Sequence, residues 1–488
     1  MSNHSFDLPA SAYAEMLRQG FKPDFPPGTE EQIEQIRALV KGGHDGLADL
    51  RALLWSSIDN DTSRDLDQIE VAERVDGGIR VKVGVADVSA AVKKGTPIDQ
   101  HAAFQTKTVY TGVRNFPMLP NELSTDLTSL NENEDRSAMV VEFVVNAQGQ
   151  RTQTSIYEVM VRNKAQLAYS RVGPWLEGKT DPDIKIEGSL ELQSQLKLQN
   201  EAAQTLREYR VAEGALEFHR IEADPIVVDG EVRSIAVAPK NHATELIEDF
   251  MIAANETMAE TLQAAGRSCI RRVVRSPERW DRIVELVDRY GTQLPAEPNS
   301  GELNAFLRKQ RKLDPIHYPD LSLAIIKLMG PGEYVLSSGS DKEPLGHFGL
   351  AARDYTHSTA PNRRFADLVM QRLVKAMLAN QPSPYTDAEL AAIATQCNLQ
   401  EKAGHKVERT MQKRVAAVAL EDSIGRVFAG VVTGANEKGT YVRVLDPPVE
   451  GRVVRGEKGI DVGDRVNVKL LHTNPQMAYI DFARVSVR

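Results

Sequence analysis

Four aspartates, Asp59, Asp61, Asp65 and Asp67, lie within nine positions in the stretch SSIDNDTSRDLDQIEVAERV. Carboxylates at this density repel one another, and burying them without a partner is costly, so the spacing indicates a bound positive group. In an extended chain Asp65 and Asp67 share a face, because side chains alternate. With Asp59 folded back beside them, they would form an all-oxygen site of the kind that Mg²⁺ prefers.

Two other interpretations of this stretch remain open at the level of sequence. The first is an ordinary solvated acidic loop. The second is a calcium loop, because Asp59, Asp61, Ser63 and Glu70 fall at its first, third, fifth and twelfth positions. Arg64 stands where that loop needs glycine, and the residues that follow favour a strand rather than a helix, so the calcium loop is the weaker alternative.

The segments that must position these carboxylates are strands followed by helices. The alternating runs IEVAERV and IRVKVGVADV flank Asp76-Gly77-Gly78, which predicts a hairpin. Further strands are predicted over 138–150 and 151–161, and helices over 185–213 and from ATELIEDF to Gly266. Helices continue to about residue 420, so residues 56–423 are predicted to form one large α+β domain.

The two ends of the chain differ from this domain. Residues 1–55 contain three short amphipathic segments, SAYAEMLRQGF, TEEQIEQIRALVKGG and GLADLRALLW, and predict a small helical domain, either helix-turn-helix-like or a simple cap. Residues 424–488 show short alternating strands with frequent turns, which predicts a small β-barrel. That barrel carries ten Lys/Arg and seven Asp/Glu, a charge of +3 within a chain of −9, as expected of a nucleic-acid module.

Composition narrows the class of protein. The 488 residues suit a multidomain globular protein, and the net charge of −9 argues against a protein that coats nucleic acid along its whole surface. Cys269 and Cys397, the only cysteines, make neither a disulfide framework nor a zinc site. The sequence shows no signal peptide and no apolar run long enough for a bilayer. We therefore expect a cytoplasmic protein without a membrane partner.

Several long motifs, in order, resemble the ribonuclease II family. They are the spaced aspartates with their hairpin, TVYTGVRNFPMLPNELSTDLTSLNENEDRSAMVVEF, EGALEF, IEDFMIAAN and HFGLAARDYTHSTAPNRRFADLVMQRL. Together they cover roughly residues 50–420, and the tail resembles the OB-fold RNA-binding domain that closes these enzymes. The resemblance implies an RNB-type catalytic domain and a Mg²⁺-dependent 3′→5′ exoribonuclease. Such an enzyme degrades single-stranded RNA processively to nucleoside 5′-monophosphates; we expect a monomer without an obligate protein partner.

The resemblance also assigns the metal site. Asp59, Asp65 and Asp67 match the aspartates that hold the metal, and Asp67 matches the one most closely tied to cleavage. Gln68 stands where the family usually has a second consecutive aspartate. Its amide oxygen can ligate Mg²⁺ but brings no charge, so metal binding should be weaker or held by other groups. A catalytically inactive RNA-binding relative is therefore the alternative, and a nuclease acting mainly on DNA is a third possibility.

The same resemblance places the RNA contacts. Tyr110 matches an aromatic that stacks near the 3′-terminal base, and Phe218 matches the opposing aromatic. Glu248 matches a carboxylate that contacts the terminal nucleotide. Arg363 matches the arginine that holds the scissile phosphate, and we expect its neighbour Arg364 to bind RNA as well. Stacking contributes about 1–3 kcal/mol per base without sequence preference, which suits a degradative enzyme.

Without the surrounding motifs, Arg363 and Arg364 favour the solvated start of a helix, but the residues around them are compatible with the phosphate site that the resemblance implies. Pro361 is followed by apolar residues at helical spacing, so a helix is expected to begin at Pro361, capped by Ser358 or Thr359. Arg363 would then lie in the first turn, where helix N-termini attract phosphate and a guanidinium adds paired hydrogen bonds. Arginine and metal would neutralise the same phosphate from two sides.

Overall fold

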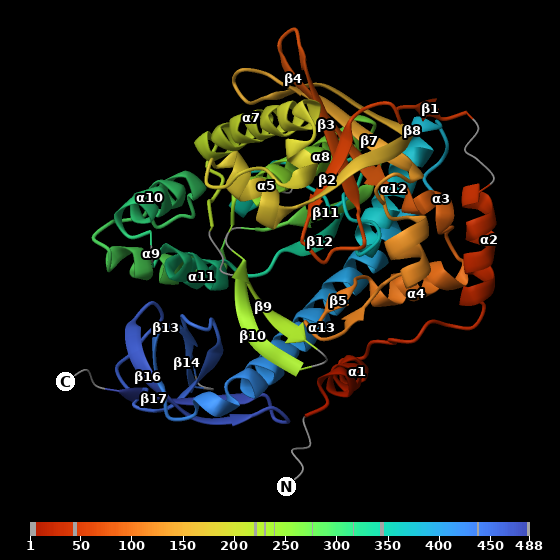
Figure 1. Ribbon diagram of the computed structural model, residues 1–488. Coiled ribbons are helices and arrows are strands. Elements are labelled where there is room, and N and C mark those ends of the chain that lie inside the picture. Colours follow the sequence, from red (N-terminus) through yellow and green to blue (C-terminus); the bar gives the residue numbers. More distant parts are fainter. Residues whose placement is uncertain are drawn as a thin grey trace.

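The fold is built around a curled β-sheet, with a helical layer on it and a separate barrel below (Figure 1). It is seen in a computed structural model, which describes residues 6–41, 46–218, 222–228, 231–238, 240–275, 277–315, 317–341, 346–436 and 439–485.

The central sheet is the element that carries the acidic stretch. Its strand order is β1 (Ala48–Asp49), β8 (Arg151–Ala168), β2 (Trp55–Asp59), β3 (Gln68–Val75), β4 (Gly78–Ala86) and β7 (Asp135–Val145). β7 also pairs with β8, so the sheet curls back on itself. The predicted hairpin is confirmed as β3–β4. Gly78 is required at its turn, because its φ is +152° and a Cβ there would lie 2.0 Å from the carbonyl oxygen of Val145.

Helices cover the sheet and complete one large core. α7 (Leu190–Ala212) and α8 (His242–Ala264) pack together and against β3, β4 and β7. The buried face of α8 includes Phe250 and Met258, and α12 (Phe365–Leu378) buries Leu368 and Val369 in the same core as Trp55. Smaller elements fill the connections: α3 (Val88–Ala91), α4 (Pro97–Gln105), β5 (Val109–Tyr110), β6 (Asn115–Phe116), a π-helix (Leu123–Leu127), α5 (Tyr169–Leu176) and α6 (Ile184–Glu187).

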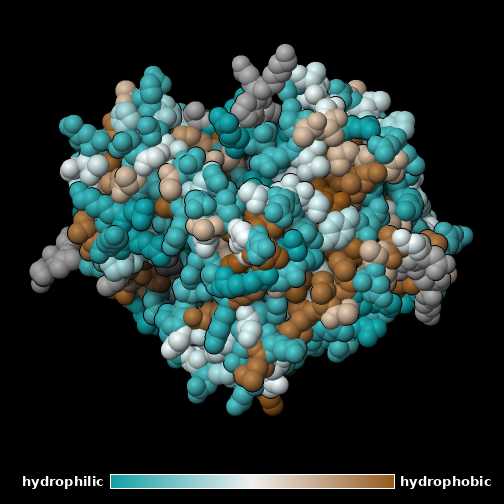
Figure 2. Space-filling view, turned by 90° about the horizontal axis from the view of Figure 1, so that it is seen from above, coloured by the Kyte–Doolittle hydropathy of each residue, from teal (hydrophilic) through white to brown (hydrophobic). Residues whose placement is uncertain are grey.

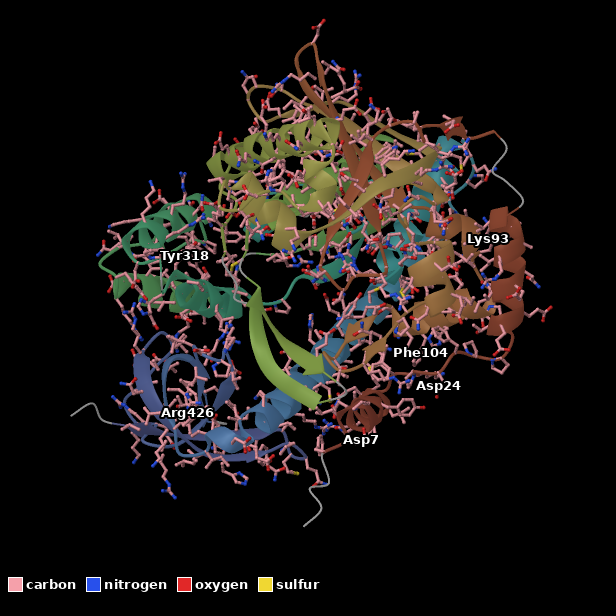
Figure 3. All side chains as sticks on the ribbon, viewed as in Figure 1. Asp7, Asp24, Lys93, Phe104, Tyr318 and Arg426 are labelled. Atoms are coloured by element: carbon pink, nitrogen blue, oxygen red, sulfur yellow. The ribbon has the colours of Figure 1, made fainter. Side chains whose placement is uncertain are left out.

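The N-terminal segment contains α1 (Leu8–Arg18) and α2 (Thr29–Lys41), as predicted, but the third predicted helix is wrong. In its place the chain forms β1, where Leu50 N–H bonds to Met160 O, and pairing with β8 overrides the helical pattern. Asp7 caps α1, which packs on the long helix α13 (Asp387–Ala419) (Figure 3). The part of the predicted helical segment at 42–45 lies outside the described residues.

A second helical group forms its own small core. It contains α9 (Trp280–Asp288), α10 (Ser300–Leu313) and α11 (Tyr318–Met329), packed around residues such as Ile283, Leu307 and Ile325. Nearby lie the hairpin β9–β10 (Glu222–Val228, Glu231–Ala238) and a 3₁₀ turn at Phe348–Leu350. The strands β11 (Cys269–Val273) and β12 (Glu333–Ser337), between which α9–α11 are inserted, pair antiparallel.

The predicted C-terminal barrel is confirmed as five closed strands: β13 (Val427–Asn436), β14 (Gly439–Val444), β15 (Glu450–Arg455), β17 (Tyr479–Val485) and β16 (Arg465–Asn474). A 3₁₀ turn at Glu421–Ser423 leads into it. The end of α13 is built into the barrel core through Ala416, Ala417 and Leu420.

The barrel also meets α9–α11 through ion pairs. Arg289 lies 2.8 Å from Asp461, Lys327 lies 2.7 Å from Glu450, and Arg465 pairs with Asp314. These pairs are partly exposed. Figure 3 shows Tyr318 in the α9–α11 group and Arg426 on the barrel, on either side of this contact.

The face seen from above mixes hydrophilic and hydrophobic residues (Figure 2). Over the described ranges, no helix combines the length and the apolar character needed to cross a membrane. The predicted fold class, an α+β domain with a helical N-terminal segment and a closed C-terminal barrel, is confirmed.

Candidate active site

The acidic loop between β2 and β3 is held by hydrogen bonds from a distant segment. Leu66 N–H donates to Ser129 Oγ at 2.9 Å, and Leu130 N–H donates to Leu66 O at 3.0 Å. On the other side, Ala86 N–H donates to Asp67 O. These contacts fix the backbone of the loop, so the carboxylates that follow have defined positions.

Asp67 is the most enclosed carboxylate of the loop, with 2% of its surface exposed. Its Oδ1 accepts a hydrogen bond from Asn362 N–H at 3.0 Å, and its Oδ2 lies 3.2 Å from Arg363 Nε. Burial raises the pKa of Asp67 to about 7, although the charge of Arg363 and the amide of Asn362 act in the opposite direction. Asp67 therefore lies near the boundary between its charged and neutral forms at neutral pH.

Arg363 lies before helix α12, which corrects the predicted helix start. The helix begins at Phe365, and Pro361 and Arg363 belong to a turn that precedes it. Ser358 does not cap a helix there; its Oγ donates to Asn255 Oδ1 at 2.8 Å. The turn is favoured because it lets the backbone after Pro361 donate to Asp67, and Thr108 N–H then bonds to Arg363 O.

Asp59, at the end of β2, lies beside Gln68 at the start of β3. Gln68 Nε2 is 3.4 Å from Asp59 Oδ1, whereas Asp59 Oδ2 is buried without a hydrogen-bond partner. Burial raises the pKa of Asp59 to about 6; Arg363 and the Gln68 hydrogen bond oppose this rise, and the charge of Asp65 adds to it. A buried carboxylate oxygen without a partner is costly, so this position favours a cation.

Asp65 is joined to the predicted aromatic. Tyr110 Oη donates to Asp65 Oδ2 at 3.1 Å, and 40% of Tyr110 is exposed. Burial of its hydroxyl raises the pKa of Tyr110, and the charge of Arg363 opposes this. Asp61 is apart from this set and accepts a hydrogen bond from Ser170 Oγ at 2.7 Å.

The calcium-loop interpretation is wrong, because the acidic stretch joins two strands and Glu70 lies inside the second one. The predicted metal site is not preformed in the structure. Among the described residues, no group of three His, Cys, Asp or Glu side chains is arranged as a metal centre. One reason is that both oxygens of Asp67 already have partners.

The residues nevertheless fit a hard divalent cation in their chemistry. Asp59, Asp65, Asp67 and Gln68 offer only oxygen ligands once the Gln68 amide presents its oxygen, and Asp59 Oδ2 has no other partner. A bound cation would favour the rotamer in which the amide oxygen of Gln68, rather than Nε2, faces Asp59.

The other predicted RNA-binding residues lie in different surroundings. Arg364 is held by Asp367, with Nε–Oδ2 and Nη2–Oδ1 distances of 2.9 and 2.7 Å. Phe218 is half-buried against the α9–α11 core. Glu248, on α8, pairs with Lys240 at 2.6 Å, and 44% of its side chain is exposed. The structure thus brings together the metal-site residues, Tyr110 and Arg363, while these three pack elsewhere.

Two groups that shape the site were not among the predicted site residues. Asn362 is buried and bonds Thr128 twice: its Oδ1 accepts from Thr128 Oγ1 at 2.6 Å, and its Nδ2 donates to Thr128 O at 3.3 Å. Ser129 holds the acidic loop. No local pattern in the sequence indicates that Asn362 and Thr128 are partners.

Comparison with known proteins identifies the families that match the two main parts of the chain. The RNB domain family matches residues 47–380, and the RNase II-type exonuclease C-terminal S1 domain matches residues 426–485. Ribonuclease R of Escherichia coli strain K12 is 28% identical over 95% of this chain, and ribonuclease R of Aquifex aeolicus is 29% identical over 98%. The chain spans 60% of the length of the first and 68% of the second.

Solved structures share the fold. Mycoplasma genitalium RNase R in complex with ribose-methylated single-stranded RNA has a TM-score of 0.86 at 23% identity, covering 98% of this chain and 78% of that one. Yeast Ssd1, described as a pseudonuclease, has a TM-score of 0.65 at 15% identity, covering 92% of this chain and 56% of that one. Proteins with this fold therefore include both a ribonuclease R and a protein described as a pseudonuclease.

Proposed function

Because the chain belongs to the RNB domain family, we propose that it is a 3′→5′ exoribonuclease that hydrolyses single-stranded RNA processively to nucleoside 5′-monophosphates. The observation that carries the proposal is the contact of Arg363 with Asp67 beside Asp59. By their resemblance to the family's motifs, Asp59 and Asp67 are proposed to hold the metal and Arg363 the phosphate; Asp67 and Arg363 come from segments almost 300 residues apart.

We propose Mg²⁺ as the cofactor, held by Asp59, Asp65, Asp67 and Gln68. Such an ion, when bound, lowers the pKa of a water molecule and neutralises charge on the phosphate. The raised pKa values of Asp59 and Asp67 support a cation here, because burial disfavours the charged form of each carboxylate and Arg363 offsets this only in part.

Arg363 has two roles in the proposed reaction. Its Nε orients Asp67, while its terminal nitrogens have no partner among the described residues, and 48% of the side chain is exposed. Those nitrogens can donate paired hydrogen bonds to the scissile phosphate and stabilise the charge that develops during cleavage. Asn362 N–H holds Asp67 from the other side, so the carboxylate cannot rotate freely.

The RNA would be gripped by separate groups along its path. Tyr110 is proposed to stack on the 3′-terminal base, since it is exposed and its hydroxyl is anchored to Asp65. Phe218, Glu248 and Arg364 remain proposed RNA contacts. The basic barrel would bind the RNA backbone farther along the strand. We also propose that the protein acts as a monomer in the cytoplasm.

The test uses a single-stranded RNA labelled at its 5′ end and the purified full chain. With Mg²⁺, full-length RNA should disappear into one short labelled product, and a chelator should prevent this. Asp67→Asn should abolish cleavage and retain RNA binding, whereas Asp61→Asn, in the same loop but bonded to Ser170, should cleave normally. Cleavage by Asp67→Asn at the wild-type rate would refute the assignment of the site.

One observation favours a second candidate, a catalytically inactive RNA-binding protein. Gln68 removes a charge that the family's site usually has, and no group of three acidic side chains among the described residues forms a metal centre. Intact RNA in the same assay, together with tight RNA binding, would select this candidate. Restored cleavage in Gln68→Asp would then identify Gln68 as the cause.

A further inference from the structure

Glu70 is a buried acidic residue that the proposed reaction does not use. It lies inside β3, with 0% of its surface exposed, and neither of its carboxylate oxygens has a hydrogen-bond partner. A buried carboxylate without a partner costs several kcal/mol. A strand position in a sheet core normally carries an apolar residue, so the retention of Glu70 calls for a positive partner.

The strand directs Glu70 toward the acidic site. Side chains alternate along β3, so Glu70 lies on the same face as Gln68, one step deeper in the sheet. Gln68 reaches Asp59 on that face. Ser56, which lies opposite Glu70, belongs to β2, the strand that ends at Asp59. Glu70 therefore lies next to Gln68 on the face of β3 where Gln68 contacts Asp59.

The groups around Glu70 are also oxygens. Ser56 is its direct cross-strand partner, and Gln199 on α7 donates its Nε2 to Glu70 O at 3.4 Å. Ser56 Oγ, Gln199 Oε1 and Asp59 Oδ2 are all buried without a partner. The donor set therefore contains two carboxylates, a hydroxyl and an amide oxygen, and it suits a hard cation. Among the described residues, no Lys or Arg forms an ion pair with Glu70.

We propose that Glu70 supplies the charge that Gln68 lacks, as an additional carboxylate of the divalent-cation site beside Asp59. Glu70 approaches from one step deeper on β3, with Ser56 and Gln199 completing its polar surroundings. The proposal rests on the proposed metal-dependent function, and it explains how a chain with glutamine at position 68 keeps enough negative charge to bind a divalent ion.

The test measures metal binding directly. The full-length protein, freed of metal with a chelator and dialysed, is titrated with Mn²⁺, and free Mn²⁺ is followed by electron paramagnetic resonance. Glu70→Gln should weaken Mn²⁺ binding by about tenfold or more. Adding Gln68→Asp to it should restore most of the affinity. Glu73→Gln is the matched control, because Glu73 is on the same strand but pairs with Arg80 and Lys82.

The outcomes separate this proposal from the function on which it rests. Wild-type affinity in Glu70→Gln would overturn the role of Glu70 while leaving a metal-dependent nuclease intact. Absence of Mn²⁺ binding and of RNA cleavage in the wild-type protein would overturn both. Thermal melting in chelator reports folding, so a Glu70→Gln variant that melts with the wild type and binds Mn²⁺ more weakly separates metal binding from folding.

A second variant covers the case in which Glu70→Gln does not fold. Glu70→Asp keeps the charge but shortens its reach, so it should weaken Mn²⁺ binding less than the loss of the charge does, by about threefold or more. If Glu70→Asp and the control Glu73→Gln both bind Mn²⁺ with the wild-type affinity, the proposal is overturned.

Discussion

Replacing Asp67 with asparagine should stabilise the metal-free protein while removing its proposed activity. Asp67 is 2% exposed, and burial raises its pKa to about 7 from the usual value of 3.8. The folded protein therefore holds this carboxylate in a place that disfavours its charge. Asparagine has nearly the same shape and can still accept the hydrogen bond from Asn362 N–H, but it carries no charge to bury.

The size of the effect follows from the pKa. A rise of roughly three units corresponds to about 4 kcal/mol of charge penalty at alkaline pH. Below about pH 4 the carboxyl is protonated in both states and the penalty vanishes. Between about pH 4 and 7 the folded state keeps a proton that the unfolded chain has lost, so wild-type stability falls as the pH rises. At pH 5 the penalty is under about 2 kcal/mol.

Thermal melting in chelator at pH 8 and pH 5 measures this difference. With about 2.1 cal/mol/K of unfolding entropy per residue, a region the size of residues 47–380 gains about 1–2 °C per kcal/mol. Asp67→Asn should therefore melt about 6 °C above wild type at pH 8, and by less than half of that at pH 5. Asp61→Asn should shift little at either pH. A variant that melts below wild type at pH 8, or shows the same gap at both, would refute the reasoning.

Three other changes test separate parts of the structure. Arg363→Lys should lower the single-turnover cleavage rate by about 10²–10³-fold with RNA affinity nearly kept, because the paired donors are lost; a rate near wild type would contradict this. Arg452→Gln with Arg455→Gln, both exposed on the barrel, should reduce the salt slope of RNA binding by about 1.4 if each contacts a phosphate, and filter-binding titrations that give an unchanged slope would exclude these contacts. Ser129→Ala should cost about 1–3 kcal/mol, since Leu66 N–H is left unpaired, and an unchanged urea midpoint would show that the loop is held in another way.

Local patterns were sufficient to predict β3, β4, β7, β8, the barrel and the grouping of the acidic residues, but not β1, β2 or β9–β12. The alternation from Ile69 onward predicts β3 and β4. The spacing of Asp59, Asp65 and Asp67 reflects the loop that joins β2 to the antiparallel strand β3. These signals lie within a few residues of one another. The assignment of Arg363 to the same site came instead from the resemblance to a family, because no local pattern joins positions so far apart.

What the sequence could not show depends on partners distant along the chain. Asn362 bonds Thr128, 234 positions away, and neither residue belongs to a periodic pattern. The start of α12 was misplaced for the same reason: a turn that donates a hydrogen bond to Asp67 replaces the helical turn that Pro361 would favour. Likewise, the sequence around Leu50 has a helical pattern, but in the structure Leu50 N–H bonds to Met160 O of β8.

The two attachments of the barrel differ in kind, and this has a mechanical consequence. At α13 the joint is apolar and continuous with the barrel core, whereas at α9–α11 partly exposed ion pairs lie beside an apolar contact of Val462 with the helical core. Exposed pairs contribute about 0–1 kcal/mol each and weaken with salt, while apolar contacts do not. Raising the salt concentration should therefore weaken the attachment at α9–α11 more than the attachment at the end of α13, a helix of about 50 Å.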